Sequence, residues 1–513
     1  MRNIFNTISR AKTSYNWMDK SHSHLTTFKM GQLVPTLVEE TMPGDQWNIQ
    51  MQAFYRMPAQ LAPVFHDVFA TTHFFYTPYR LLWPNWDSHM TGKNTHTVPY
   101  VDNLANDITE DSLANYLGMP TEINNDTPKF TCFDIAALAK IHDDYYMSDA
   151  LGTAIFTELS DGDNNAEYSG YYIAEPFSRS YNHDYFTTAL PTSQQGAAVS
   201  LPLLENDTAD VVLKGSAPYS SQLVRNATSG AAANWNVDAT GGSPTGTLNN
   251  SGTDATLDPN GSWEVDINAE ATDIRTLRRA FKLQEFLEAS IRVGTRMNDW
   301  LWGIFGVKSP DATLDRAEYI GGLKQPVVFS EVLATAESTG VAVGDLSGHA
   351  ISVGGSGNLK HYCSEYGLIM GITNVQPRTS YYQGIHRRYF RDDRLDWPIP
   401  HFANIGEQEI YQGEIYGAGN GSTLLSTWGY APRYAEWKTS PNRISGEFRS
   451  TLEYWHLGRK FSAAPTLNET FLQVDPADQE RIFAVSGEHH LQAKLQFNIK
   501  VKRKLPFFGD PSI

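Results

Sequence analysis

Two amphipathic segments near opposite ends of the chain constrain its fold more than any other feature. Between residues 491 and 502, apolar side chains alternate with polar or basic ones, and residues 46–55 alternate in the same way. A period of two predicts strands with one buried and one solvated face. Because the two strands lie at opposite ends of 513 residues, antiparallel strands distant in sequence must pair. Greek-key sandwiches and jelly rolls meet this requirement.

Further strands and a few helices are predicted between these two segments. The β-branched and aromatic run at 68–76, ended by Pro78, predicts a strand buried on both faces. No series of alternating strands and crossover helices is seen, which argues against a doubly wound fold. The other predicted strands are 325–333, 362–375, 446–457 and 488–504, and the predicted helices are 103–118, 133–147 and a helix that begins at Thr272.

A long polar segment interrupts this pattern. Of the 48 residues 215–262, 36 are Gly, Ser, Thr, Asn, Ala or Pro, so the segment cannot form a core of its own. We expect one domain at 31–513 with an insertion at 206–262, a helical insertion at 272–303, and a basic arm at 1–30. The helix carries a basic stripe whose simplest interpretation is a solvated face, with interchain ion pairs or phosphate contacts as alternatives: Arg275, Arg278, Arg279 and Lys282.

Charge is distributed unevenly along a chain of formal net charge −17. Residues 101–275 contain 26 acids and 6 bases, and the remainder contains 31 acids and 34 bases. Both chain ends are locally basic, which a polyanionic partner would explain. Solubility, or pairing with acids of neighbouring subunits, would explain it as well. The candidate phosphate contacts are Arg2, Arg10, Lys12, Lys500, Lys502, Arg503 and Lys504, with Tyr15 and Trp17 as possible stacking partners.

Catalytic and cofactor motifs are absent from the sequence. There is no phosphate-binding P-loop, no nucleophile elbow and no H-E-x-x-H. His22 and His24 alone make a weak metal site, and the neighbouring carboxylates at 143–144 and 392–393 lack a partnering motif. We therefore expect no enzyme, no cofactor and no metal.

The same sequence bears on where the protein folds. Two isolated cysteines, Cys132 and Cys363, exclude a disulfide scaffold and suit a reducing cytoplasm. The first 20 residues carry charges throughout and show no apolar core of a signal peptide. No stretch approaches the length of a membrane helix, so no membrane association is expected.

An ordered set of short blocks resembles the major capsid protein of the Microviridae, the small tailless single-stranded-DNA phages, in their gokushovirus-like branch. The blocks are spread over most of the chain outside the insertion. They are HSHLTTF (22–28), PGD (43–45), HFFY (73–76), YRLLW (79–83), LRRAF (277–281), GTR (294–296), FGV (305–307), SPDA (309–312), EYIGG (318–322), PRT (377–379), GEQ (406–408), PRYAEWK (432–438), GEFR (446–449) and YWHL (454–457).

This resemblance implies a mainly β fold, an eight-stranded antiparallel jelly roll of the viral capsid type with large loop insertions. It implies a T=1 icosahedral shell, assembled from pentamers in the cytoplasm of a bacterial host, that encloses circular single-stranded DNA. The implied partners are further copies of the chain, a small basic packaging protein, a pilot protein and a host surface receptor. The insertion would form a protrusion at the threefold axes, where Leu223, Val224 and Trp235 of three copies could be buried together.

Two other classes of protein fit the same strand pattern. A secreted carbohydrate-binding module or adhesin would also lack catalytic motifs, but it would need a secretion signal. A jelly-roll glycoside hydrolase would need carboxylates roughly 5–10 Å apart on facing strands, whereas the acidic pairs found here are neighbours in sequence.

Overall fold

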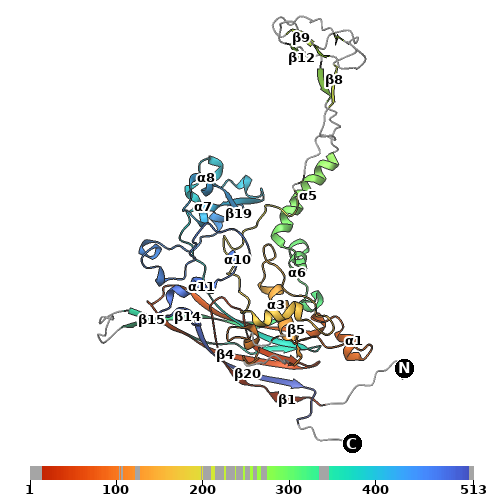
Figure 1. Ribbon diagram of the computed structural model, residues 1–513, viewed down its shortest axis with the longest axis vertical. Helices are drawn as coiled ribbons and strands as arrows, with labels where there is room; N and C mark the ends of the chain where they lie inside the picture. Colours follow the sequence, from red (N-terminus) through yellow and green to blue (C-terminus); the bar gives the residue numbers. More distant parts are fainter. Residues whose placement is uncertain are drawn as a thin grey trace. The chain divides into compact units, whose positions relative to one another are not determined.

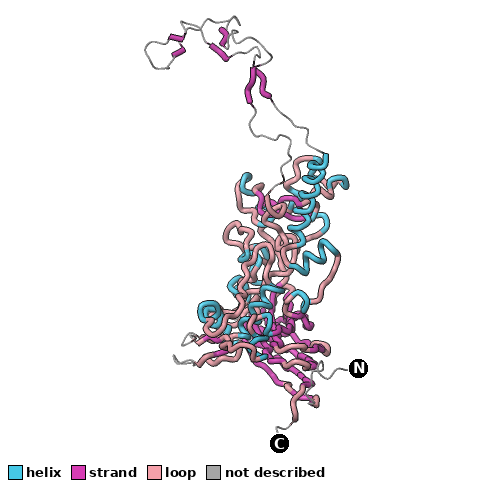
Figure 2. The backbone as a smooth tube through the Cα atoms, turned by 90° about the vertical axis from the view of Figure 1, so that its right-hand side faces the viewer, coloured by secondary structure: helices cyan, strands magenta, loops and turns pink. Residues whose placement is uncertain are grey.

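The computed structural model describes residues 14–102, 104, 108–121, 128–197, 199, 274–333 and 346–507, together with the backbone of six short strands between 210 and 266. The chain divides into two compact units. The first comprises 1–193 and 290–513, and the second comprises 194–289. In the first unit, strands gather at one end and most helices and loops at the other (Figures 1 and 2).

A ten-stranded antiparallel sheet organises the first unit. Its strands follow the order β1-β20-β4-β15-β14-β5-β17-β3, with β2 beside β20 and β16 beside β4. The chain ends meet in this sheet, because β20 pairs with β1, β2 and β4. The strands are β1 (Asn16–Asp19), β2 (His22–Phe28), β3 (Val34–Thr41), β4 (Gln46–Gln60), β5 (Val68–Pro78), β14 (Glu318–Leu333), β15 (Leu346–Gly355), β16 (Leu359–Tyr362), β17 (Gly367–Pro377) and β20 (Leu491–Arg503).

The sheet curls so that its two halves enclose the main hydrophobic core (Figure 1). Phe74 of β5 and Phe497 of β20 meet edge to face, with ring centroids 6.4 Å apart. Trp47 and Tyr55 of β4 are buried in the same core. The predicted pairing of the terminal segments is therefore confirmed, and the architecture is of the jelly-roll type.

A helical layer covers the outer face of the half that contains β3, β17 and β5. A second core fills the space between them, and it includes Phe75 of β5 and most of α3 (Phe133–Ile141). Every residue of β17 is buried as a result, and the prediction of a strand buried on both faces at 68–76 is confirmed. The layer also contains α1 (Trp86–Thr91), β6 (Tyr100–Val101), α2 (Leu113–Tyr116), β7 (Phe130–Thr131) and α4 (Asn165–Ile173).

A third cluster lies among long loops farther from the sheet. Its centre is a two-stranded sheet whose Ile410 and Trp428 are buried. The elements of this region are β18 (Glu407–Tyr411), α7 (Gln412–Ile415), α8 (Gly421–Leu424), β19 (Thr427–Pro432), α9 (Ala435–Lys438) and α10 (Glu469–Leu472). The next helix, α11 (Pro476–Gln479), lies beside the sheet (Figure 1).

The predicted strand at 446–457 is wrong. The segment forms two 3-10 turns, Gly446–Arg449 and Glu453–Trp455. Gly446 has a φ of 73°, in the left-handed region that extended strands do not use. The aromatic side chains pack on a loop instead. The ring of Trp455 stacks on that of Phe65, with the ring centroids 5.6 Å apart.

Two other predictions need adjustment, and a third holds. Within the predicted arm, residues 16–19 and 22–28 form β1 and β2 on the sheet. Of the predicted helix 103–118, the described part is helical only at α2. The prediction at 133–147 holds, since a π-helical turn at His142–Tyr146 follows α3.

The second unit contains nested antiparallel strand pairs. The outermost pair is β8 (Asp210–Leu213) with β13 (Trp263–Asp266), the next is β9 (Val224–Asn226) with β12 (Ala255–Leu257), and the innermost is β10 (Val237–Asp238) with β11 (Thr247–Leu248). The predicted helix is α5 (Ile274–Val293), which runs across the boundary between the units and precedes α6 (Met297–Trp300). Within the described ranges, no helix combines the length and apolar character of a membrane span.

Candidate nucleic-acid interface

One half of the sheet has an outer face that is open to solvent. In β4 and β20, buried and exposed side chains alternate, and adjacent strand residues point to opposite faces. The exposed side chains of β1, β2, β20, β4 and β16 therefore share one surface. We call this surface the open face, and we define it by Trp17, Asp19, Leu25, Gln46, Phe54, Arg56, Lys360, Tyr362, Lys494, Lys500 and Lys502.

Strand pairing arranges these side chains in rows across the sheet. In one row, Lys502 lies between Trp17 and Gln46, and Gln46 pairs in turn with Tyr362. In another, Lys494 lies between Leu25 and Phe54. Successive rows are about 7 Å apart, since a strand rises about 3.4 Å per residue. Two rows of the surface thus combine a cation with aromatic rings, and the rows between them carry Ser, Gln, Asn, Asp and Lys side chains.

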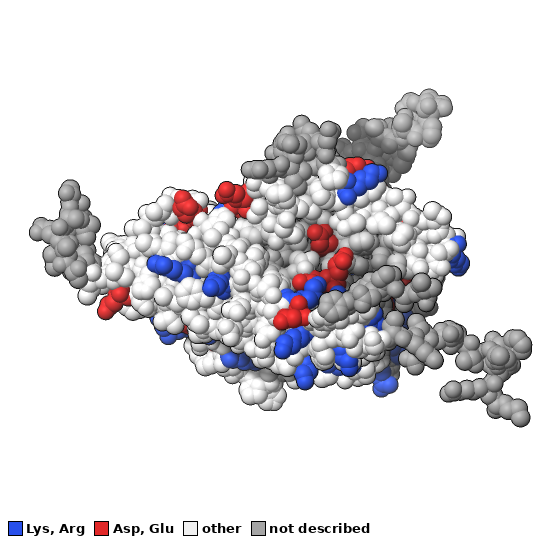
Figure 3. Space-filling model, turned by 90° about the horizontal axis from the view of Figure 1, so that it is seen from below, with Lys and Arg blue, Asp and Glu red and all other residues white. Residues whose placement is uncertain are grey.

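The cations of the open face are available to an external anion, although Lys500 also attracts the Asp19 carboxylate on the neighbouring strand. Among the described residues, none forms an ion pair with Lys494, Lys500, Lys502, Lys360 or Arg56. Asp19 pairs in register with Lys500, and hydrogen bonds donated by Ser21 lower the pKa of the Asp19 carboxyl. Seen from below, Lys and Arg side chains lie along the lower margin of the view, where Asp and Glu are few (Figure 3).

Exposed rings accompany these cations. Trp17 is 55% exposed and Tyr362 is 59% exposed. The ammonium groups of Lys502 and Lys504 lie 5.5 and 5.2 Å from the centre of the Tyr15 ring. Cations that contact phosphates and rings that stack on bases are the two elements of sequence-independent binding to single strands.

Arg503, in contrast, has a structural role. Its guanidinium donates to the carboxylate of Asp45 at 2.6 Å and to the backbone oxygen of Glu40 at 3.2 Å. Asp45 is fully buried and also accepts a hydrogen bond from the Met42 amide at 3.0 Å. This guanidinium joins the last strand to the turn before β4, so it is not available to a phosphate.

Several predicted contact residues lie outside the described residues. These are Arg2, Arg10 and Lys12 of the arm, and Leu223 and Trp235 of the insertion. Val224 begins β9, of which only the backbone is described. The structure brings Lys500, Lys502 and Lys504 together at one end of β20.

The prediction missed Arg56, Lys360 and Lys494. Arg56 and Lys494 occupy the solvated phase of the two alternating strands, so the alternation could have identified them. Lys360 could not be found in this way, because the short strand β16 gives little periodic signal.

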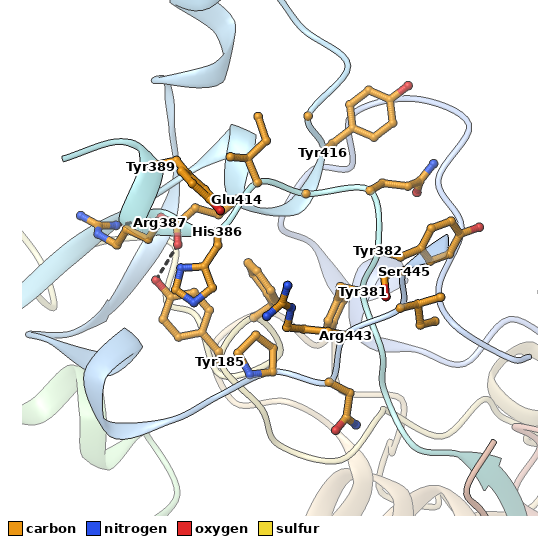
Figure 4. A pocket seen from close by; sticks show the side chains of 18 of the residues that line it. Tyr185, Tyr381, Tyr382, His386, Arg387, Tyr389, Glu414, Tyr416, Arg443 and Ser445 are labelled. Carbon is orange, nitrogen blue, oxygen red and sulfur yellow. Dashed lines mark hydrogen bonds and ion pairs between the residues drawn. The ribbon is translucent and has the colours of Figure 1, made fainter. Parts of the chain in front are cut away.

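A separate cavity of about 710 Å³ lies among the loops around α7 (Figure 4). Its polar groups mostly satisfy one another. Glu414 accepts hydrogen bonds from Arg387 at 2.8 Å and from the Tyr185 hydroxyl at 2.9 Å, and burial raises the pKa of its carboxyl. Glu436 lies 3.8 Å from the same guanidinium. These two carboxylates hold Arg387 in place, which is a structural arrangement.

Residues 6–513 match the model of a protein family described as "Capsid protein (F protein)". The chain belongs to this family of phage capsid proteins. It is 29% identical to capsid protein VP1 of Chlamydia phage 1, over 100% of this chain and 98% of the relative. It is 31% identical to capsid protein VP1 of Bdellovibrio phage phiMH2K, over 99% and 97%. For VP1 of Spiroplasma virus 4, identity is 24% over 96% and 94%.

The comparisons confirm the central predictions. The chain is a capsid protein of the phage virion, similar to those of the gokushovirus-like Microviridae, and it assembles with copies of itself. Because proteins of this family are structural, the prediction that the chain is not an enzyme is confirmed as well. The carbohydrate-binding module and the glycoside hydrolase are thereby set aside.

Proposed function

We propose that this capsid protein forms a T=1 icosahedral shell through pentamers and turns its open face toward circular single-stranded DNA. The observation that carries the proposal is a solvated sheet surface with cations that lack ion-pair partners among the described residues, interleaved with exposed rings. Facing solvent would give such a surface no favourable binding free energy. It would gain counterion release from phosphates and stacking from unpaired bases.

The basic chain ends extend the same surface. Asn16 pairs with Arg503, so the first described residues and the last strand leave the sheet together. Arg2, Arg10 and Lys12 precede this point in the sequence and would add cations at the same edge. A small basic packaging protein would compete for the same phosphates, and a pilot protein would be a further partner.

Replacing Lys494, Lys500 and Lys502 by Gln tests the DNA contact. Loss of three phosphate contacts is expected to make the plot of log K against log salt concentration shallower by about 2, since each contact contributes roughly 0.7 for single strands. The measurement is a salt titration of disassembled subunits with circular single-stranded DNA. All three side chains lie on the solvated face of β20, so the subunit should fold normally.

The matched control replaces three exposed lysines remote from the open face, Lys93, Lys308 and Lys438. It removes the same charge from the chain but should leave the slope unchanged. If the salt-dependence slope became equally shallow in both variants, net charge alone would govern DNA binding. The open face would then have no specific role in it.

We propose in addition that the insertion at 206–262 acts in host attachment. Two observations support this role: residues 194–289 form a compact unit of their own, and they contain nested strand pairs. Its acids, Asp207, Asp210, Asp238, Asp254 and Asp258, outnumber Lys214 and Arg225, which suits it poorly to DNA phosphates. Loops displayed on a rigid scaffold commonly carry recognition.

Replacement of residues 215–262 by a short Gly/Ser linker is expected to leave shell formation intact and to abolish most adsorption to host cells. Shell yield is measured by sedimentation, and adsorption by the loss of free particles from the medium. Failure of assembly would assign the insertion a structural role. Unchanged adsorption would remove it from attachment.

A further inference from the structure

A hollow in the first unit has cations without any acid to neutralise them. Two adjoining cavities of about 310 and 440 Å³ share His73, Arg179, Asn182 and Tyr319 as lining residues. The walls come from β5, β14 and the segments around Tyr146 and Arg179. Each cavity is many times the roughly 30 Å³ that one water occupies in the liquid, so the hollow can hold a side chain.

Arg179 is the main charge in this hollow. Its Nη1 donates to Thr71 and, at 3.3 Å, to Asn374 Oδ1. Within the described residues, its Nε and Nη2 donate to no acceptor and no carboxylate pairs with it. Burial lowers the pKa of the guanidinium, yet arginine stays charged in proteins. The guanidinium is partly buried and also lies 5.6 Å from the centre of the Tyr146 ring. Its remaining N–H groups can donate charge-assisted hydrogen bonds to an incoming carboxylate.

The other lining groups add charge and apolar surface but no acid. Lys324 Nζ lies 4.5 Å from the centre of the Phe69 ring. The His73 ring stacks on Tyr146 at 6.0 Å and meets Tyr319 edge to face at 5.8 Å. The hollow thus offers one free guanidinium edge, one ammonium group and a wall of rings. Arg and Tyr are among the residues that most often dominate the binding energy of protein–protein interfaces.

The position of the hollow excludes the genome as its occupant, if the proposed orientation of the open face holds. Phe74 of β5 faces the main core, so Thr71 and His73 project to the opposite side of that strand. The open face is the outer surface of the other half of the sheet. The hollow and the open face therefore lie on opposite sides of the sandwich.

We propose that the hollow is an assembly contact that receives an acidic side chain, with its apolar neighbours, from a second copy of this chain. The protein assembles with copies of itself, and it carries 57 acids against 40 bases. Charge complementarity and the size of the hollow both fit an acidic segment better than a bare ion.

Arg179→Met tests the contact in empty shells without DNA, which separates the outcome from that of the DNA proposal. Loss of one partner of a buried charge pair should raise the subunit concentration needed for assembly about 30-fold. The melting temperature of the free subunit verifies folding. Lys93→Met, at an exposed lysine that does not line the hollow, is the control and should assemble normally. Normal assembly of a folded Arg179→Met subunit would overturn the proposal.

A second measurement uses only the unaltered chain. Lys324 should react with acetic anhydride in free subunits and be protected at least tenfold in shells, as read by mass spectrometry. Equal labelling in both states would contradict the contact. Inorganic phosphate is the third probe: a rise in subunit melting temperature that Arg179→Met abolishes would assign the hollow to a small anion and overturn the proposal.

Discussion

Lowering the pH from 6.5 to 4 is expected to reduce the free energy of unfolding of the free subunit by about 5 kcal/mol through His490, which is buried, and His73, which is partly buried. Burial lowers the pKa of His490 and of His73 to about 4, with Lys29 and Arg179 respectively as the next contributors. The unfolded chain binds these protons near pH 6.5, so it takes up more protons than the folded chain over this range. Each ring then contributes about 2.5 kcal/mol of pH dependence over this interval.

His490 shows why the neutral ring is required. It is 1% exposed, accepts a hydrogen bond from the Met30 amide through Nδ1 at 3.1 Å, and stacks on Phe483 at 4.8 Å. A protonated Nδ1 could no longer accept from Met30. The ring would carry its charge against the core, where a positive charge is expensive to bury.

His490→Gln isolates this contribution, since Gln keeps an acceptor for the Met30 amide but does not titrate. Denaturant unfolding at a series of pH values should show that the variant loses about 2.5 kcal/mol less free energy of unfolding between pH 6.5 and 4 than the unaltered chain. The raised pKa values of Asp134 and Glu414 act in the opposite direction and are common to both proteins. The same substitution at exposed His401 should leave the profile unchanged. An identical profile for His490→Gln would refute the assignment.

The sequence predicted those parts of the fold in which burial imposes a period. In β4 and β20 one face is exposed to solvent and the other faces the core, so apolar and polar side chains alternate almost without exception. In β5 both faces are covered, and a continuous apolar run results. Residues 446–457 are aromatic without being in a sheet, because Phe448 and Trp455 pack on Phe65. Local composition cannot distinguish these two uses of aromatic residues.

The candidate interface was predictable to a similar degree. The basic polar phase of β20 identified Lys500 and Lys502, which the structure places on the open face. Arg503 is also basic, but it shares the inward-facing phase of Leu495, Ile499 and Val501, and its side chain turns to Asp45. The alternation therefore places Arg503 on the inward side, but its partner Asp45 comes from the other end of the chain, and no local pattern could identify that partner. Whether a cation faces solvent or a buried acid is a tertiary property.

Removing either partner of the Arg503–Asp45 pair should destabilise the folded subunit by about 3–5 kcal/mol, because the remaining charge stays buried and unpaired. Asp45 is fully buried and Arg503 is largely enclosed, with its guanidinium 5.8 Å from the centre of the Trp47 ring. Arg503→Met keeps most of the side-chain volume. The decrease in the free energy of unfolding therefore measures mainly the cost of leaving the Asp45 carboxylate buried without a partner. Denaturant unfolding of the free subunit at pH 7 gives the change in the free energy of unfolding.

Arg503→Met combined with Asp45→Leu should recover much of that loss, since apolar replacements of a buried ion pair are often nearly neutral. Recovery will be incomplete, because the Met42 amide loses its acceptor on Asp45 and an unsatisfied donor costs about 1–3 kcal/mol. Lys500→Met, on the open face of the same strand, is the matched control and should change stability by less than about 0.5 kcal/mol. A loss of stability in Arg503→Met no larger than in this control would mean that Arg503 is an exposed cation, available to phosphates after all.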